Sequence, residues 1–509
     1  MFGKMTLTKI SAKLNLQNQP GQRFNVVPIL LALLIILYVG AIMGLHWLRQ
    51  ERFMNGFDLA FYEQAAWNTG HGRFLEVSGT DFSHSLLGTD VILIVALMTP
   101  LYMLVQSPLT LLFQETLVVA LGAIPVYWLA RDRLGNRVAG LLFALTYLLL
   151  LGVQNGNLYE LRFRPMAMSF LLFAFYYYER GRFWPFLAFA TLALTCRPEN
   201  GLVLIMLALY GFIKGRPKIF GWHFVIGPLI LGAVWFTLAT LVIIPGLSTG
   251  SIALSENFAG GSPQAALIQL FTNPVEFFSD NSLLGKLCYL PLLLLPLLFL
   301  PLGSPTVLLM ALPLLAINLL SKRPMQWNAY DYHYQGSIIP WLLAATIFTL
   351  EKWQTKPLRF LRRIKSNLFL PGAVLAATVA IYLLFNLIFS LSSLKLPDDI
   401  ARTDNGIAKI LTRKEQPRWE AGKELLKLIP PDAPLAITNL WSSQVKPRQG
   451  LWLFRNKTLY SVHPTLTAQY IFADLRSADD KPLIDELPPA EWEVLDQKQD
   501  YILLKKKKS

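Results

Sequence analysis

Residues 26–47, VVPILLALLIILYVGAIMGLHW, form an apolar run that contains no Lys, Arg, Asp or Glu. A helix of about 20 such residues is long enough to cross the hydrocarbon core of a bilayer. The run is longer than the apolar core of a signal peptide, and no small-residue cleavage site follows it before the next loop. It therefore predicts a first membrane span that is retained in the mature protein.

The remainder of the 509-residue chain has the same character. Hydrophobic residues make up 54% of it and charged residues only 15%, and the mean hydropathy is +0.43. A soluble fold cannot hide this much apolar surface, so the bilayer must act as the solvent for most of the chain. This composition excludes an intrinsically disordered chain, a disulfide scaffold and a nucleic-acid enzyme. We expect a mainly α-helical, polytopic membrane protein.

About eleven spans are predicted, give or take two, because several apolar segments are short. The turns around Arg197 and Gly303 are compatible with re-entrant helix pairs as well as with full hairpins. The predicted spans lie near 26–47, 107–130, 137–153, 165–178, 183–196, 200–213, 220–245, 286–302, 304–320, 334–351 and 369–392.

The formal net charge of +14 is distributed unevenly along the chain. Every second loop carries a basic cluster, whereas the loops 48–90 and 246–285 are acidic or neutral. This alternation is the positive-inside pattern. It predicts a multi-pass protein of the cell inner membrane with a cytoplasmic N-terminus, an extracytoplasmic C-terminus and no nucleic-acid partner.

Two domains are expected. Residues 1–392 would form the transmembrane domain, with an outer loop at 48–106 in which 91–106 is a helix that lies at the outer interface or dips into the membrane. Residues 393–509 are richer in charge and would form a small extracytoplasmic α/β domain. It contains a helix-like segment at 419–429, a strand-like LAITNL at 435–440, and two strands joined by a turn at 492–506.

The first outer loop carries the candidate catalytic residues. In the segment 55–67, NGFDLAFYEQAAW, Asp58 and Tyr62 are spaced i and i+4, as are Glu63 and Trp67. A carboxylate held among aromatic rings at the membrane surface is suited to act as a general base towards an acceptor hydroxyl. The alternative is an interfacial amphipathic helix with a solvated acid. Asp81, His84 and Asp90 follow in the same loop and are a candidate divalent-metal site for Mg or Mn, together with Asp58.

Three arginines interrupt the charge pattern on the predicted outer side. Arg162 and Arg164 lie in YELRFRP (159–165), and Arg197 lies in CRPEN (196–200). Their guanidinium groups match the oxygens of a phosphate or pyrophosphate. Mutual pairing of Arg162 with Glu160 and of Arg197 with Glu199 is the competing interpretation. A fourth segment, NAYDYHY (328–334), adds Tyr332 and His333 as candidate phosphate-binding residues.

The segments FDLAFYEQAAWNTG, RPMAMSFLLFAFYYYERGR and DYHYQGSIIPWLLAA resemble a large prokaryotic family of polytopic membrane proteins defined as a domain of unknown function. The layout of that family is similar to that of GT-C glycosyltransferases, which use polyprenyl-phosphate sugars. The resemblance implies a catalytic acid in the first outer loop, where this chain has Asp58, with Glu63 as second candidate. In that family an Asp-Phe-His-Pro-like motif often stands where this chain has Arg162-Phe-Arg164-Pro165. The replacement of a carboxylate and an imidazole by two cations argues against metal or acid–base chemistry there and leaves phosphate binding open.

The leading hypothesis is a GT-C-like enzyme that transfers a sugar from a polyprenyl-phosphate donor to an extracytoplasmic glycan, lipid or protein acceptor. Its partners would be the lipid donor, that acceptor and the surrounding membrane lipids. One alternative is a lipid or solute transporter or flippase, for which inverted repeats and ions at mid-depth would be expected. The other is a non-catalytic cell-envelope scaffold.

Overall fold

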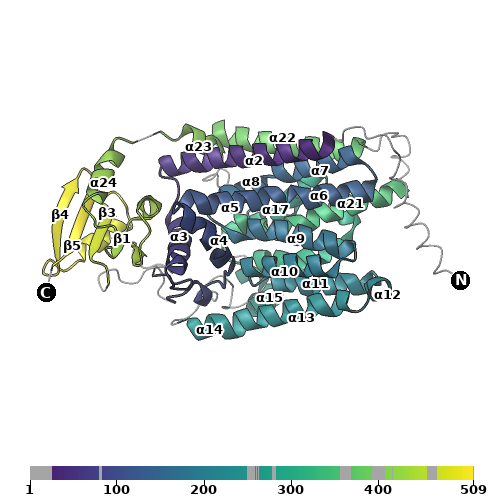
Figure 1. The fold of residues 1–509 in the computed structure, drawn as a ribbon, viewed down its shortest axis with the longest axis horizontal. Coiled ribbons are helices and arrows are strands. Elements are labelled where there is room, and N and C mark those ends of the chain that lie inside the picture. Colours follow the sequence, from purple (N-terminus) through teal and green to yellow (C-terminus); the bar gives the residue numbers. More distant parts are fainter. Residues whose placement is uncertain are drawn as a thin grey trace.

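Most of the chain folds into a bundle of roughly parallel helices, with a small domain at one end (Figure 1). The computed structural model describes residues 26–78, 83–248, 258, 261, 263–277, 283–355, 368–391, 407–414, 416–454 and 467–507. The N-terminal half of the bundle contains α2 (Val26–Glu51), α3 (Phe57–Gly70), α4 (Ile94–Leu104), α5 (Pro108–Leu121), α6 (Ala123–Leu134), α7 (Arg137–Leu149), α8 (Leu151–Leu158), α9 (Phe163–Glu179), α10 (Phe183–Cys196), α11 (Asn200–Ile213), α12 (Arg216–Phe220) and α13 (His223–Thr237).

The second half is more broken. Prolines begin or interrupt many of its helices, because proline lacks the N–H needed inside a helix. The α-helices are α14 (Ile244–Leu247), α15 (Pro263–Thr272), α16 (Pro274–Phe277), α17 (Leu283–Leu294), α18 (Pro305–Leu308), α19 (Leu312–Leu320), α20 (Pro324–Trp327), α21 (Ile339–Thr355) and α22 (Phe369–Leu391). The short 3-10 turns include η1 (Leu86–Gly88), η5 (Leu295–Leu297), η6 (Leu300–Gly303), η7 (Leu309–Ala311) and η8 (His333–Gln335), and η2 (Leu238–Ile243) is a π-helical stretch that joins α13 to α14.

Each of the eleven apolar segments predicted from the sequence coincides with helical structure. Among the described residues, the stretches Val26–Glu51, Pro108–Leu134 and His223–Leu247 are continuous, long and apolar enough to cross a membrane. The pair α7 and α8 meets the same test with a 44° bend between them. Helices such as α10 and α11 are shorter, and the number of full crossings remains a prediction.

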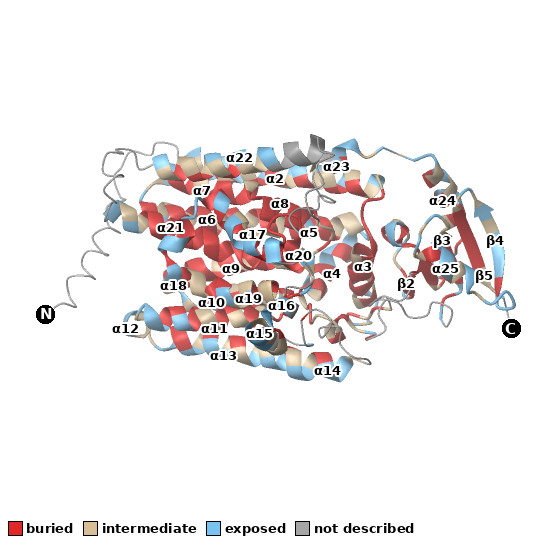
Figure 2. Cartoon of the chain, turned by 180° about the vertical axis from the view of Figure 1, so that it is seen from behind, coloured by how far each residue is buried: buried red, intermediate tan, exposed pale blue. Residues whose placement is uncertain are grey.

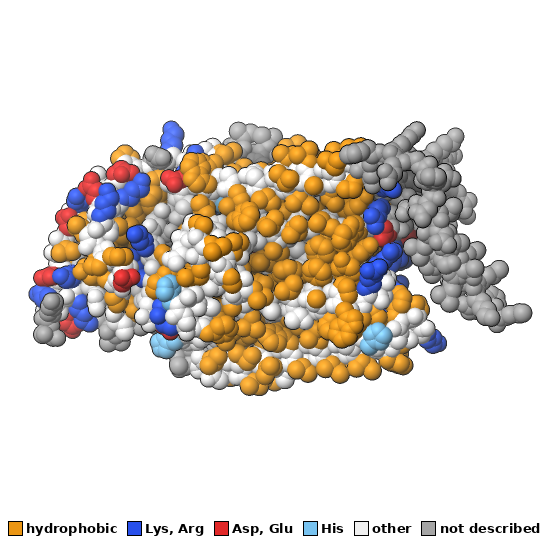
Figure 3. All heavy atoms as spheres, in the orientation of Figure 1, with side chains coloured by type: hydrophobic (Ala, Val, Ile, Leu, Met, Phe, Trp, Pro, Cys, Tyr) orange, Lys and Arg blue, Asp and Glu red, His pale blue; other side chains and the backbone are white. Residues whose placement is uncertain are grey.

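The surface of the bundle fits a bilayer environment. On the face seen in Figure 3, apolar side chains form a belt across the helices, and charged side chains gather beyond both ends of that belt. Exposed Leu, Ile and Val side chains are frequent on α2 and α13. The protein is therefore a multi-pass membrane protein with a mainly α-helical fold.

The C-terminal domain contains a five-stranded mixed sheet in the order β2-β1-β3-β5-β4. Its elements are α23 (Ile407–Thr412), α24 (Arg418–Leu426), β1 (Leu435–Ile437), η10 (Asn439–Gln444), β2 (Leu451–Leu453), β3 (Tyr470–Asp474), α25 (Asp480–Asp485), β4 (Trp492–Lys498) and β5 (Tyr501–Lys506). β1 pairs in parallel with β2 and β3, and β5 is antiparallel to β3 and β4. The expected helix at 419–429 and the expected strands within 492–506 are confirmed by α24, β4 and β5. The strand expected at 435–440 is shorter than expected, because β1 ends at Ile437 and η10 begins at Asn439.

The domain packs against α3 rather than hanging free of the bundle. The ring of Phe53, in the turn between α2 and α3, lies 4.7 Å from Trp419 and 4.5 Å from Trp441 of the domain. Gln64 on α3 donates to the carbonyl oxygen of Gln449, at 2.5 Å. As a result α3 is buried along most of its length, between bundle and domain (Figure 2).

Candidate functional site

The side chains with functional potential gather at the end of the bundle that carries α3. We call the following group the ion cluster: Asp58, Asp90, Arg162, Arg164, Arg197, Glu199 and His333. Its three arginines and three carboxylates balance formally. The arginines and carboxylates come from four segments: the start of α3, the loop before α4, the junction of α8 with α9, and the turn between α10 and α11. The histidine comes from a fifth segment, η8.

Asp58 lies in the first turn of α3 and forms a salt bridge with Arg162. The Asp58 side chain is 40% exposed, whereas that of Arg162 is 12% exposed. Arg162 also stacks over the ring of Tyr159, with its guanidinium carbon 4.9 Å from the ring centroid. The salt bridge thus joins Arg162 to Asp58, and not to Glu160 as the competing interpretation of the sequence had it. Asp58 presents a carboxylate that is both oriented and accessible.

Arg164 and Arg197 share one carboxylate. Arg164 is 2.5 Å from Glu199, and the Nε of Arg197 is 3.1 Å from the same oxygen. Arg197 also pairs with Asp90 at 2.9 Å. Burial alone would raise the pKa of Glu199, but Arg197 and Arg164 outweigh burial and lower that pKa to about 2. Glu199 is therefore a fixed anion that holds two cations close together despite their mutual repulsion.

His333 completes the cluster from η8. Its Nε2 accepts a hydrogen bond from Arg164 at 3.2 Å, which places the ring proton on Nδ1. Burial, Arg162, Arg164 and Arg197 hold the pKa of His333 well below its usual range, so the ring is neutral. Tyr332 lies beside it, buried, and its ring is 5.3 Å from that of Tyr159.

Two donors of the ion cluster are buried without a hydrogen-bond partner: Nε of Arg162 and Nδ1 of His333. Buried donors are nearly always paired in folded proteins, so an unpaired one marks a position where a ligand or water is expected. Both side chains lie against the ring of Tyr159, at 4.9 Å for Arg162 and 5.5 Å for His333. The two unpaired donors are suited to an anionic oxygen.

Glu63, the second catalytic candidate of the sequence, lies away from the ion cluster. Its carboxyl group is buried and accepts a hydrogen bond from the Tyr102 hydroxyl on α4, at 3.1 Å. Burial raises the pKa of Glu63 to about 8. The group is therefore protonated at neutral pH and unsuited to act as a base.

The candidate metal site stays a prediction, because not all of its members lie among the described residues. Asp81 lies outside them, His84 is exposed, and Asp90 is engaged by Arg197. No group of three His, Cys, Asp or Glu side chains within the described ranges is arranged to hold a metal ion. Asp90 also belongs to the ion cluster through Arg197, and nothing in the sequence indicated that pairing.

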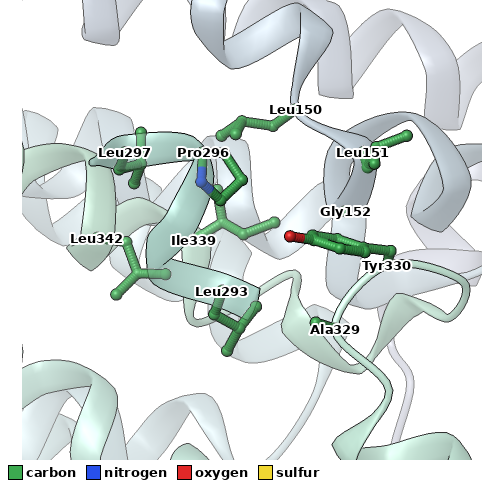
Figure 4. A pocket seen from close by; sticks show the side chains of 10 residues that line it. All are labelled: Leu150, Leu151, Gly152, Leu293, Pro296, Leu297, Ala329, Tyr330, Ile339 and Leu342. Atoms are coloured by element: carbon green, nitrogen blue, oxygen red, sulfur yellow. The ribbon is translucent and has the colours of Figure 1, made fainter. Parts of the chain in front are cut away.

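A small pocket opens elsewhere in the bundle, among α8, α17 and α21 (Figure 4). It encloses about 20 Å³, room for about one water molecule. Its lining residues are Leu150, Leu151, Gly152, Leu293, Pro296, Leu297, Ala329, Tyr330, Ile339 and Leu342. None of them belongs to the ion cluster, and this apolar lining offers no chemistry.

The helical bundle, its apolar belt and the ion cluster at one end define a polytopic helical membrane protein. A family model described as "Predicted membrane protein (DUF2079)" matches residues 49–507, and the chain belongs to this family. The family expected from the sequence is thereby confirmed. No curated protein matches the chain.

Solved structures similar to this one include two of the protein ArnT. The first is ArnT from Cupriavidus metallidurans bound to undecaprenyl phosphate, with a TM-score of 0.49 and 11% identity over 92% of this chain and 97% of that one. The second is ArnT from the same organism in the apo state, with a TM-score of 0.47 and 12% identity over 88% and 92% of the two chains. A likeness at this level does not inform substrate or chemistry.

Proposed function

We propose that this protein is a membrane-embedded glycosyltransferase of the GT-C class, which transfers a sugar from a polyprenyl-phosphate donor to an acceptor hydroxyl. The observation that carries the proposal is the pairing of an accessible carboxylate, Asp58, with a buried arginine cluster that has unpaired donors. A transferase of this kind needs a base for the acceptor and a cationic site for the departing phosphate.

In the proposed reaction Asp58 accepts the proton of the acceptor hydroxyl as the hydroxyl oxygen attacks the anomeric carbon. The bond from the anomeric carbon to the phosphate oxygen breaks, and its electron pair leaves with the lipid phosphate. Arg162, Arg164 and Arg197 would balance the charge that develops on that phosphate, and Nδ1 of His333 would donate to it. The low exposure of these groups strengthens each interaction, because water does not screen them.

The extracytoplasmic placement of this site and the inner membrane as its location are part of the proposal. A lipid-linked donor suits a site at the edge of the bilayer, since its tail remains among lipids while the acceptor arrives from the aqueous side. The gathering of the cluster at one end of the bundle, rather than at mid-depth, favours an enzyme over a transporter or flippase. An accessible carboxylate held beside buried arginines favours an enzyme over a scaffold without catalysis.

The test is the Asp58→Asn variant in membranes supplied with labelled polyprenyl-phosphate sugars. Asparagine keeps the size of the side chain but cannot take up a proton, so transfer should fall by about 100- to 10,000-fold. Glu63→Gln is the matched control, because it replaces another carboxyl group of the same helix outside the cluster. Undiminished transfer by Asp58→Asn, or an equal loss in the control, would remove Asp58 from the mechanism.

A further inference from the structure

The first turn of α3 carries Asp58 but has no cap of its own. Its N-cap residue, Gly56, has no side chain to accept hydrogen bonds from the free N–H groups of the turn. Such groups need partners when a helix end is buried. Here both partners come from distant parts of the chain.

Glu160 supplies the first partner. Its carboxylate accepts hydrogen bonds from the backbone N–H of Gly56 at 2.9 Å and from that of Leu59 at 3.1 Å. Glu160 itself has a positive φ of 52°, a conformation that costs free energy for a non-glycine residue. That backbone strain is concentrated next to Arg162, the salt-bridge partner of Asp58.

Asn439 supplies the second partner from the C-terminal domain. Its Oδ1 accepts a hydrogen bond from the backbone N–H of Phe57 at 2.8 Å, and Phe57 directly precedes Asp58. Asn439 begins η10, just after β1, which lies between β2 and β3 in the sheet. Trp441, two residues later, packs against Phe53. The capping oxygen is therefore fixed both to the sheet and to the turn that leads into α3.

We propose that Asn439 is a positioning residue of the candidate site, and that through it the C-terminal domain holds the first turn of α3 so that Asp58 meets Arg162. The proposal rests on the proposed function, because Asp58 is the group being positioned. Loss of the cap would fray the turn and displace the carboxylate. A displacement on the order of 1 Å at a reacting group is enough to slow chemistry markedly.

The chain offers a matched control in the same short helix. Nε2 of Gln444 donates to the backbone carbonyl oxygen of Gln50 at 2.8 Å. This bond also joins the C-terminal domain to the bundle, and it has the same length as the Asn439 bond. It ends on α2, however, and does not touch α3. Gln444→Ala therefore weakens domain contact without removing the cap.

The experiment compares the full-length wild type with Asn439→Ala and Gln444→Ala in two assays. One is hydrogen exchange of the amides at Phe57–Leu59, and the other is sugar transfer with kcat and KM measured separately. Asn439→Ala should exchange about fivefold faster in this turn, as expected for the loss of one helix cap. Its kcat should fall by on the order of tenfold with little change in KM. Gln444→Ala should match the wild type in both assays.

A second variant, in case Asn439→Ala does not fold, changes the capped residue Gly56 on the bundle side of the contact. A Cβ at Gly56 would lie 2.8 Å from Oδ1 of Asn439 and 3.1 Å from Oε1 of Glu160, so Gly56→Ala should displace both caps and reproduce the faster exchange. Wild-type exchange in both capping variants, or equal effects in Gln444→Ala, would overturn the proposal. If the wild type transfers no sugar, the transferase assignment fails, and the exchange assay by itself supports or overturns the capping by Asn439.

Discussion

Burial and the neighbouring side chains determine the chemical role of single residues in this protein. Asp58 and Glu63 lie five positions apart on one short helix, and the sequence offered both as candidate bases. Asp58 meets Arg162 and remains accessible, whereas Glu63 faces the Tyr102 hydroxyl in an apolar core. The same chemical group is thus paired with an arginine at one position and buried as a neutral acid at the other.

The protonation of Glu63 makes stability depend on pH. Its pKa is raised from 4.5 to about 8 in the folded protein, so the folded state binds more protons than the unfolded state between these values. The contribution of Glu63 to stability is therefore complete below about pH 4.5 and is lost as pH rises through about 8. Glu63→Gln removes this dependence. We expect the apparent unfolding temperature of the wild type to fall more between pH 5 and pH 8 than that of the variant.

The measurement is thermal unfolding of the purified protein in detergent at both pH values. Glu420→Gln is the control, since the Glu420 side chain is 73% exposed on α24. It should retain the wild-type dependence on pH. Parallel curves for the wild type and Glu63→Gln would contradict a protonated Glu63.

At the scale of elements, the helices are held by close packing and by caps from residues distant in the sequence. These interactions replace the hydrophobic effect that stabilises the packing of soluble helices. Between helices in a bilayer, small residues let backbones approach and gain van der Waals contact. Gly201 on α11 and Gly232 on α13 face one another in this way, and α11 and α13 are extensively packed. The first turn of α3 is capped by the side chains of Asn439 and Glu160, which lie far from it in the sequence.

The α11–α13 contact predicts a specific sensitivity. A Cβ at Gly232 would lie 2.4 Å from the carbonyl oxygen of Gly201, which is backbone and cannot move aside cheaply. Gly232→Ala should therefore destabilise the protein by about 1–3 kcal/mol. Gly44→Ala on α2 is the control, because nothing lies within 4 Å of a Cβ there. Thermal unfolding in detergent measures both, and equal unfolding temperatures would show that the helices separate without cost.

At the scale of the whole molecule, two ionic groups lie at opposite ends of the apolar belt (Figures 1 and 3). The ion cluster lies at the end that carries α3. At the other end Glu179, whose side chain is 3% exposed, pairs with Arg133 and Arg216. These residues come from α9, α6 and α12, so the second group ties three helices together. Arg133 also pairs with Glu351 of α21 at 3.3 Å, and this linking of several helices suits a structural role.

The predicted orientation in the membrane can be tested with single cysteines. Lys423 on α24 and Arg180 at the end of α9 have side chains that are 47% and 43% exposed, at opposite ends of the molecule. In a variant lacking Cys196 and Cys288, we expect Lys423→Cys to react with a membrane-impermeant maleimide in intact spheroplasts. Arg180→Cys should react only after the membrane is permeabilised. The reverse result would place the ion cluster on the cytoplasmic side.

The sequence by itself determined the class of the protein and the course of its helices. A bilayer-length apolar run such as 26–47 has one low-energy state in lipid, because its backbone must satisfy its own hydrogen bonds. The strands at 492–506 were likewise visible, since their alternation and turn are local signals. The same holds for the membership in DUF2079, which rests on residues of the chain alone.

The composition of the site was decided by the tertiary structure. The residues Asp58, Arg162, Arg197 and His333 could be singled out, because charges near an apolar segment are costly. The sequence could not show which of these residues pair with one another. It also gave no local signal that Asp90 pairs with Arg197 or that Asn439 caps α3. The partner of Asp58 lies 104 positions away and the cap on Phe57 comes from 382 positions away. Such pairings depend on how helices and domain pack, and neither spacing nor composition encodes that geometry.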